Sequence, residues 1–121
     1  MAARSLAPRL TDIIEAIDHI RSEMAGVSIE AFEADWRKQW LVERGVEIIS
    51  EASRHLTDEL KARHPEIPWP KVAGIGNVLR HDYASIAAPI MWKLVHDDLP
   101  PLERVCREEL ARDQAGGNSG K

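Results

Sequence analysis

Apolar residues recur along most of this chain at steps of three and four, the spacing that places them on one face of an α-helix. The clearest stripe consists of Leu10, Ile13, Ile14, Ile17, Ile20 and Met24. No segment alternates apolar and polar residues with β-branched enrichment, and the chain has no Asn-Gly or Asp-Gly hairpin turn. The pattern therefore predicts an all-α fold.

Capping residues and helix breakers divide the first half of this pattern. A first helix is expected over residues 8–24 and is ended by a glycine at position 26. A second, much longer helix is expected from the N-cap Ser28 to residue 63, where a His-Pro pair stops it. Gly45 falls inside this long helix and is expected to kink it.

The second half of the chain predicts shorter helices over residues 71–81, from residue 85 onward, and over 101–112. The stretch "DDLPPL" is expected to break the chain before the last of them. The predicted architecture is an up-down helical bundle of four to five helices, with two long antiparallel helices as its spine. Residues 1–113 are expected to form one domain, and residues 114–121 a disordered tail.

Tryptophans are expected to supply much of the large apolar surface, because the chain has few other aromatic residues. Trp69 lies in a proline-rich connector and is expected to fill the core. Trp36, Trp40 and Trp92 are interpreted as core residues or dimer-interface anchors rather than as ligand-stacking residues.

Composition limits the classes of function. The chain has 121 residues with 16 Lys and Arg against 20 Asp and Glu, so its net charge of −4 does not favour bulk electrostatic binding of nucleic acid. Cys106 is the single cysteine, which excludes an internal disulfide and favours a reducing compartment. It is expected to be a small apolar residue on a helix. No signal-peptide or membrane-spanning pattern is present, so a cytoplasmic location is expected.

The stretch "GIGNVLRHDY", residues 74–83, concentrates polar side chains. In one interpretation, Arg80 and His81 cap the last carbonyls of a helix, where cations are favoured. In another, His81 is a general acid or base, and Asn77 and an arginine hold a phosphate group. RNA would suit such a site because its own 2′-hydroxyl can attack the adjacent phosphate. The residue types leave both interpretations open.

Other catalytic patterns are weak. The histidines and the cysteine lack metal-ligand spacing, and Gly74-x-Gly76 follows no predicted strand, so neither a metal nor a cofactor is expected. Glu47 and Glu51 form either a carboxylate pair or part of a solvated helix face, and the arginines around them favour the solvated face.

Four segments, in order, resemble the HepT-like toxins of the HEPN superfamily. They are "RGVEIISEASRHL", "PEIPW", "GIGNVLRHDY" and "IMWKLVHDDLPPL". The resemblance covers nearly the whole chain. It implies a helical bundle that pairs as a homodimer, with metal-independent ribonuclease sites in a cleft at the dimer interface. It also implies a toxin–antitoxin system whose antitoxin is a minimal nucleotidyltransferase.

The family motif is an arginine, a polar residue and then a histidine. Carried over by position, the histidine is His81, the polar residue is Asn77, and the tyrosine that the antitoxin adenylylates is Tyr83. The arginine would fall on Gly76, so this chain departs from the motif there. Arg80 is the tentative replacement as charge stabiliser.

Three hypotheses follow. In the first, the protein is an endoribonuclease toxin. In the second, its site is degenerate, and a helical dimer binds or is modified by a nucleotidyltransferase partner. In the third, it is a nucleotide-binding substrate domain of such a transferase. An RNA substrate would require a local basic groove, for which the candidates are Lys71, Arg80, Arg54 and Arg63.

Overall fold

The computed structural model describes the backbone of residues 5–81 and 84–119, and the side chains of residues 5–75 and 88–116. Every regular element in these ranges is helical, which confirms the predicted all-α fold. The elements are α1 (Ala7–Met24), α2 (Ile29–Glu33), α3 (Trp36–Ser53), α4 (Asp58–Arg63), α5 (Trp69–His81), α6 (Ala84–Lys93), the π-helical turn η1 (Leu94–Asp98) and α7 (Leu99–Ser119).

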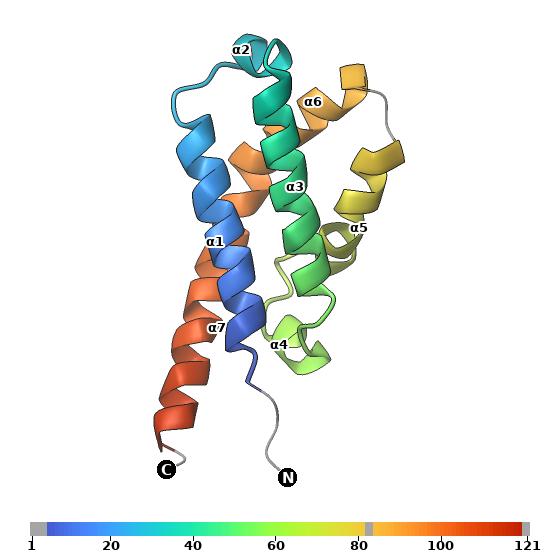
Figure 1. Cartoon of the computed structure of the whole chain (residues 1–121). Coiled ribbons are helices and arrows are strands. Elements are labelled where there is room, and N and C mark those ends of the chain that lie inside the picture. The colour runs from blue at the N-terminus through green and yellow to red at the C-terminus, as the bar shows by residue number, and fades with distance from the viewer. Residues whose placement is uncertain (1–4, 82–83, 120–121) are drawn as a thin grey trace.

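Three long helices form the body of the molecule (Figure 1). The chain rises through α1, turns at α2 and descends through α3, so α1 and α3 form the antiparallel spine that the sequence predicts. The helix α7 packs along α1 as a third long element, and α5 packs on the other side of α3. No helix in the described ranges combines the length and apolar composition that a membrane crossing requires.

The prediction of one long helix from residue 28 to residue 63 is wrong, because three helices occupy this range. Ser28 does cap the start of α2, accepting a hydrogen bond from the Ala31 N–H at 3.1 Å. However, Asp35 starts a new helix by accepting from the Arg37 N–H at 3.1 Å. Thr57 starts α4 in the same way. These short polar side chains compete with the helical backbone for its N–H groups, and apolar periodicity does not reveal this competition.

Gly45 does not kink α3, which runs through this position without interruption. A Cβ atom at residue 45 would lie 2.6 Å from Cδ1 and 2.9 Å from Cγ1 of Ile20 on α1. The absence of a side chain at residue 45 therefore allows α1 and α3 to approach closely.

The stretch "DDLPPL" bends the helical path without breaking it, so the predicted interruption is wrong. The helices α6 and α7 are joined through η1, in which the Leu99 N–H donates to the Leu94 carbonyl, five residues back. Pro100 and Pro101 have no N–H to donate, and their rings would clash with carbonyls four residues earlier in a regular helix. The wider π turn fits these prolines.

The end of α7 lies beyond its predicted position at residue 112, since the helical backbone continues to Ser119. The division into a domain over 1–113 and a disordered tail over 114–121 stays a prediction.

The core lies between α1, α3, α7 and the shorter helices. Its largest fully buried side chains are Phe32, Leu10, Ile13, Ile17, Ile20, Ile49, Leu60, Met91, Leu102, Val42, Val46 and Val105. Trp69 is buried as predicted, and Trp92 packs against Phe32 with ring centroids 6.3 Å apart.

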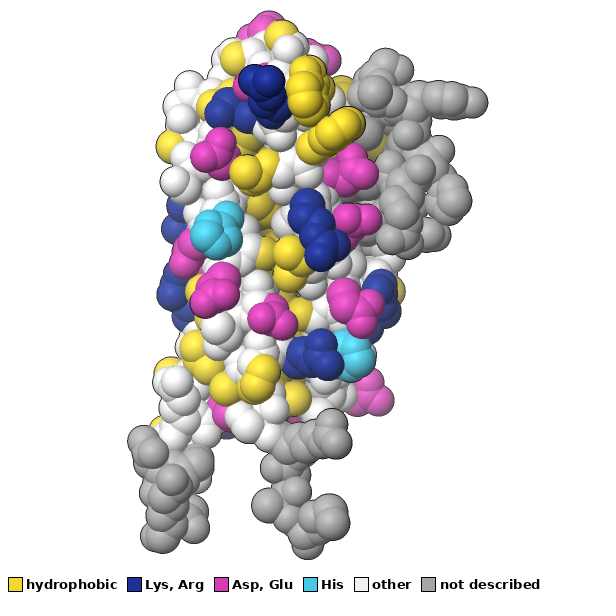
Figure 2. Space-filling view, in the orientation of Figure 1, with side chains coloured by type: hydrophobic (Ala, Val, Ile, Leu, Met, Phe, Trp, Pro, Cys, Tyr) yellow, Lys and Arg dark blue, Asp and Glu magenta, His cyan; other side chains and the backbone are white. Residues whose placement is uncertain are grey.

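Trp36 and Trp40 are not core residues: 54% and 66% of their surfaces are exposed. They are four residues apart on α3, on a face different from that of the buried Val42 and Val46. Figure 2 shows hydrophobic side chains at the surface near the upper end of the bundle. The alternative role of these tryptophans as dimer-interface anchors stays a prediction.

Cys106 lies in the core on α7, as expected for a small apolar residue, and burial raises the pKa of its thiol to about 12. Only the thiolate is nucleophilic, so we expect no alkylation of the native protein by iodoacetamide at pH 8. Intact mass spectrometry would detect one added group only after denaturation. Rapid alkylation of the folded protein would contradict this burial.

Candidate functional site

The predicted site residues lie towards the C-terminal end of α5. This helix confirms the one predicted over residues 71–81. The backbone of Asn77, Arg80 and His81 is helical there. Asn77 and His81 are one helical turn apart, whereas Arg80 is displaced from His81 by about 100° around the axis. The side chains of residues 76–87 and the whole of Tyr83 lie outside the described residues. Their proposed roles stay predictions.

The start of α5 is fixed by local sequence. Pro70 occupies the first turn, where its missing N–H has no helical partner to lose. The Trp69 indole N–H donates to the carbonyls of Lys61 at 3.2 Å and His64 at 3.0 Å, so α5 begins anchored to the end of α4.

Two side chains at the C-terminal end of α3 bind the backbone of α5 just before the predicted site: Ser50 lies on α3, and Arg54 is its C-cap residue. The Ser50 hydroxyl donates to the Val72 carbonyl at 2.8 Å. The Arg54 guanidinium donates through Nη1 to the Ala73 carbonyl at 2.7 Å, and its Nη2 lies 2.6 Å from Glu51 Oε1.

Glu51 also contacts the His55 ring, with Oε2 2.9 Å from Nε2. The hydrogen bond from Arg54, followed by that of His55, lowers the pKa of the Glu51 carboxyl below its usual value. Glu51 therefore pairs with Arg54 and His55, which lie three and four residues after it in the chain, as on the solvated face that the sequence favours.

A cavity of about 130 Å³ lies beneath α5. Its walls are mostly apolar and include Val46, Ile49, Val72, Ile75, Leu94 and Leu102. Lys71 and Asp98 also line the cavity, and their ion pair, at 3.2 Å, joins the first turn of α5 to η1.

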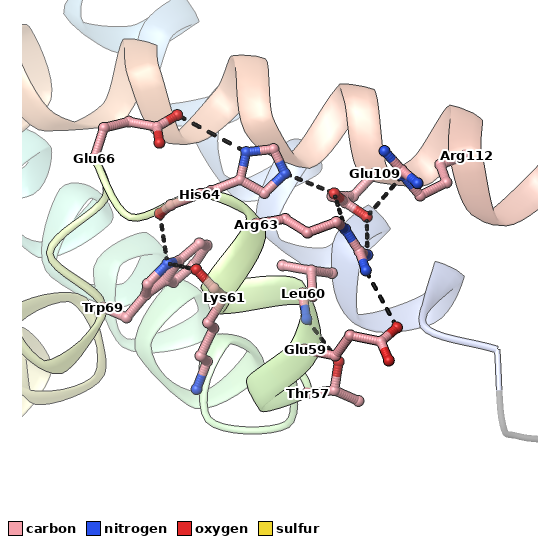
Figure 3. Close-up of polar contacts among 10 residues, drawn as sticks. All are labelled: Thr57, Glu59, Leu60, Lys61, Arg63, His64, Glu66, Trp69, Glu109 and Arg112. Carbon is pink, nitrogen blue, oxygen red and sulfur yellow. Dashed lines mark hydrogen bonds and ion pairs between the residues drawn. The ribbon is translucent and has the colours of Figure 1, made fainter.

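A second polar cluster surrounds Glu109 on α7 (Figure 3). Glu109 accepts from Arg63 Nε at 3.1 Å and Nη2 at 2.7 Å, and one of its oxygens lies 2.6 Å from His64 Nε2. Only 3% of its side chain is exposed. The Arg63 hydrogen bond, followed by that of His64, lowers the pKa of the Glu109 carboxyl. The cluster ties the end of α4 to α7.

This cluster could not be predicted from the amino-acid sequence. His64 is expected only as part of a helix stop, and Glu109 lies 45 residues away along the chain. No local spacing relates two residues at that separation, so the sequence carries no signal for the pairing.

Replacing Glu109 by glutamine is expected to destabilise the fold by about 1–3 kcal/mol, because charge-assisted hydrogen bonds from Arg63 and His64 are lost. The lowered pKa means that the wild-type carboxylate contributes fully above its ordinary pKa of 4.5. This contribution is lost as the pH falls through the lower value of the folded state. Urea unfolding at pH 7 and pH 3 should therefore show a smaller difference between variant and wild type at pH 3. An equal difference in stability at pH 7 and pH 3 would contradict a lowered pKa of the Glu109 carboxyl.

The predicted basic groove is not a set of unpaired cations. Lys71 pairs with Asp98, Arg54 with Glu51, and Arg63 with Glu109 and Glu59. The fourth candidate, Arg80, has its side chain outside the described residues. Among the described side chains, no three His, Cys, Asp or Glu residues are grouped as metal ligands would be.

Comparisons with known proteins give a consistent result. The profile of a family described as "Ribonuclease HepT-like" matches residues 13–109. A protein of Thermococcus cleftensis named "Probable ribonuclease HepT" is 38% identical over 100 residues, covering 83% of this chain and 91% of that protein. A Methanocaldococcus jannaschii protein named as a "Putative RNase" is 29% identical over 104 residues, covering 86% and 95%. No solved structure gives a significant match.

The matched range extends from α1 to α7 and includes the whole of α5 with its Asn77 and His81. It also contains the four segments on which the sequence resemblance rests. The chain therefore belongs to the ribonuclease HepT-like family.

Proposed function

We propose that this protein is a metal-independent endoribonuclease and the toxin of a toxin–antitoxin pair. The observation that carries the proposal is the family match over residues 13–109, which includes the helix with Asn77 and His81. The relative named "Probable ribonuclease HepT" supports RNA as the substrate class.

In the proposed reaction, His81 removes the proton from a ribose 2′-hydroxyl. The 2′-oxygen attacks the adjacent phosphorus, and the bond from phosphorus to the 5′-oxygen breaks. The protonated histidine then returns a proton to the leaving 5′-oxygen. Asn77 donates a hydrogen bond to a phosphate oxygen, and Arg80 stabilises the negative charge of the transition state. The products are a 2′,3′-cyclic phosphate and a 5′-hydroxyl.

The partners follow from the resemblance. A second copy of the chain would complete the cleft, and a minimal nucleotidyltransferase would be the antitoxin. Adenylylation of Tyr83 would place a bulky anion two residues from His81 and repel the phosphates of RNA.

The test is incubation of the purified chain with a defined RNA in EDTA. We expect cleavage that leaves a 2′,3′-cyclic phosphate, and no cleavage where the scissile ribose is replaced by 2′-deoxyribose. Loss of cleavage in Arg80→Ala would assign the charge-stabilising role to Arg80, and retention would assign it to another cation. No cleavage by the unmodified protein would overturn the proposal.

A degenerate helical dimer that binds or is modified by the transferase is the second candidate. Gly76, which stands where the family motif has an arginine, favours it. Under this alternative, the natural chain is inactive and Gly76→Arg restores RNA cleavage. Activity of the natural chain would exclude it.

A further inference from the structure

We propose that Arg54, together with Ser50, is a positioning residue. Its hydrogen bond to the backbone of α5 holds this helix in the position that the proposed ribonuclease site requires. The inference rests on the proposed function, since it concerns the helix that carries Asn77 and His81. Its basis is the pair of hydrogen bonds from α3 to the carbonyls of Val72 and Ala73.

The carbonyls of Val72 and Ala73 lie in α5 one turn before Asn77. In an α-helix, each carbonyl faces the N–H group four residues ahead, so those of Val72 and Ala73 face residues 76 and 77. A carbonyl oxygen has two lone pairs and can accept a second donor without losing the first. The donors from α3 therefore reach the turn that leads directly into the predicted site.

This turn is intrinsically weak because it contains Gly74 and Gly76. Glycine lowers helix stability through its large backbone entropy in the unfolded state. A Cβ atom at residue 74 would meet nothing within 4 Å, so packing does not explain that glycine. External hydrogen bonds compensate for the weak helix propensity at this point.

Arg54 is suited to this role because both terminal nitrogens of its guanidinium donate hydrogen bonds. Nη1 donates to the Ala73 carbonyl, while Nη2 pairs with Glu51 Oε1 in the last turn of α3. The planar guanidinium fixes the angle between these two donors, which a lysine ammonium does not. Ser50 adds a second contact one turn away on α3, so two points of α3 define the position of α5.

The alternative role for Arg54 is direct contact with RNA phosphate, since 49% of its side chain is exposed. The two roles differ in kinetics. A positioning residue affects the geometry of the transition state and lowers kcat, whereas a phosphate contact that acts equally on substrate and transition state raises KM.

The experiment compares Arg54→Ala, Arg54→Lys and Ser50→Ala with the wild-type chain. The matched control is Arg44→Ala, which removes an arginine within α3 whose side chain is 74% exposed and lies 3.9 Å from Glu47. RNA cleavage gives kcat and KM, hydrogen exchange followed by mass spectrometry reports the opening of α5, and urea unfolding reports global stability.

We expect Arg54→Ala to lower kcat by about ten- to a hundredfold with KM unchanged, because small displacements of catalytic groups have effects of that size. Amides of α5 should exchange faster at unchanged global stability. Arg54→Lys should recover part of kcat, Ser50→Ala should show a smaller loss, and Arg44→Ala should match the wild type.

A raised KM with unchanged kcat would overturn the inference in favour of an RNA contact. Unchanged kcat and unchanged exchange in α5 would also overturn it. If the wild-type chain cleaves no RNA, the proposed function fails, but hydrogen exchange still decides the role of Arg54. In that case, unchanged exchange in Arg54→Ala would overturn the positioning role, and faster exchange in α5 would support it.

Discussion

Replacing His81 by alanine is expected to reduce RNA cleavage by about 10²–10⁴-fold, the usual contribution of general acid–base catalysis. The reason is that no other group in the proposed reaction accepts the 2′-hydroxyl proton near neutral pH. The measurement is the rate of formation of the 2′,3′-cyclic phosphate from a short labelled RNA in EDTA. Growth arrest on expression, if the protein is a toxin, should disappear in the same variant.

His19→Ala is the matched control for this experiment. His19 is exposed on α1, and α5 packs mainly against α3. We expect this control to cleave RNA at the wild-type rate. Equal rates for His81→Ala and wild type would remove His81 from the mechanism and leave the helix-capping interpretation of residues 80 and 81.

Replacing Gly45 by valine is expected to destabilise the protein by about 3 kcal/mol, at the upper end of the range for overpacked cores. The first added carbon would already lie 2.6 Å from Ile20 Cδ1, and valine adds two further carbons. Ile20 is fully buried, so relieving the collision requires either a new Ile20 rotamer within the packed core or movement of α1 away from α3. This loss is a large part of the about 5–15 kcal/mol that stabilises a typical domain. Urea unfolding, monitored by tryptophan fluorescence, would measure it.

Gly74→Ala is the matched control for this stability change. A Cβ atom at residue 74 would meet nothing within 4 Å, and alanine is the better helix former. We expect this variant to gain about 0.5–1 kcal/mol in stability. A Gly45→Val variant as stable as Gly74→Ala would contradict the predicted collision with Ile20.

Much of the fold follows from local sequence patterns. The stripe from Leu10 to Met24 predicts α1 to within one residue of its observed start at Ala7 and gives its end at Met24. The end of α5 at His81 and the stop after Arg63 are also predicted. The errors lie where a local competitor overrides the apolar pattern. Asp35 restarts a helix by capping it, and the two prolines at 100 and 101 widen a turn instead of ending the helix.

The proximity of the candidate site residues could also be predicted from local sequence. Asn77, Arg80 and His81 lie within one stretch of one helix, so sequence spacing alone brings them near each other. The groups that hold this helix in place are not predictable, because Ser50 and Arg54 reach it from the C-terminal end of α3, about 20 residues earlier in the chain.

The helical class, the bounds of α1 and the end of α5 follow from the amino-acid sequence, because they depend on the 3.6-residue period and on local capping. The tertiary structure alone decided which distant residues meet. Gly45 lies against Ile20, Glu109 pairs with Arg63 and His64, and Arg54 donates to the backbone of α5. Each of these pairings depends on how whole helices pack, and no periodicity along the chain encodes that packing.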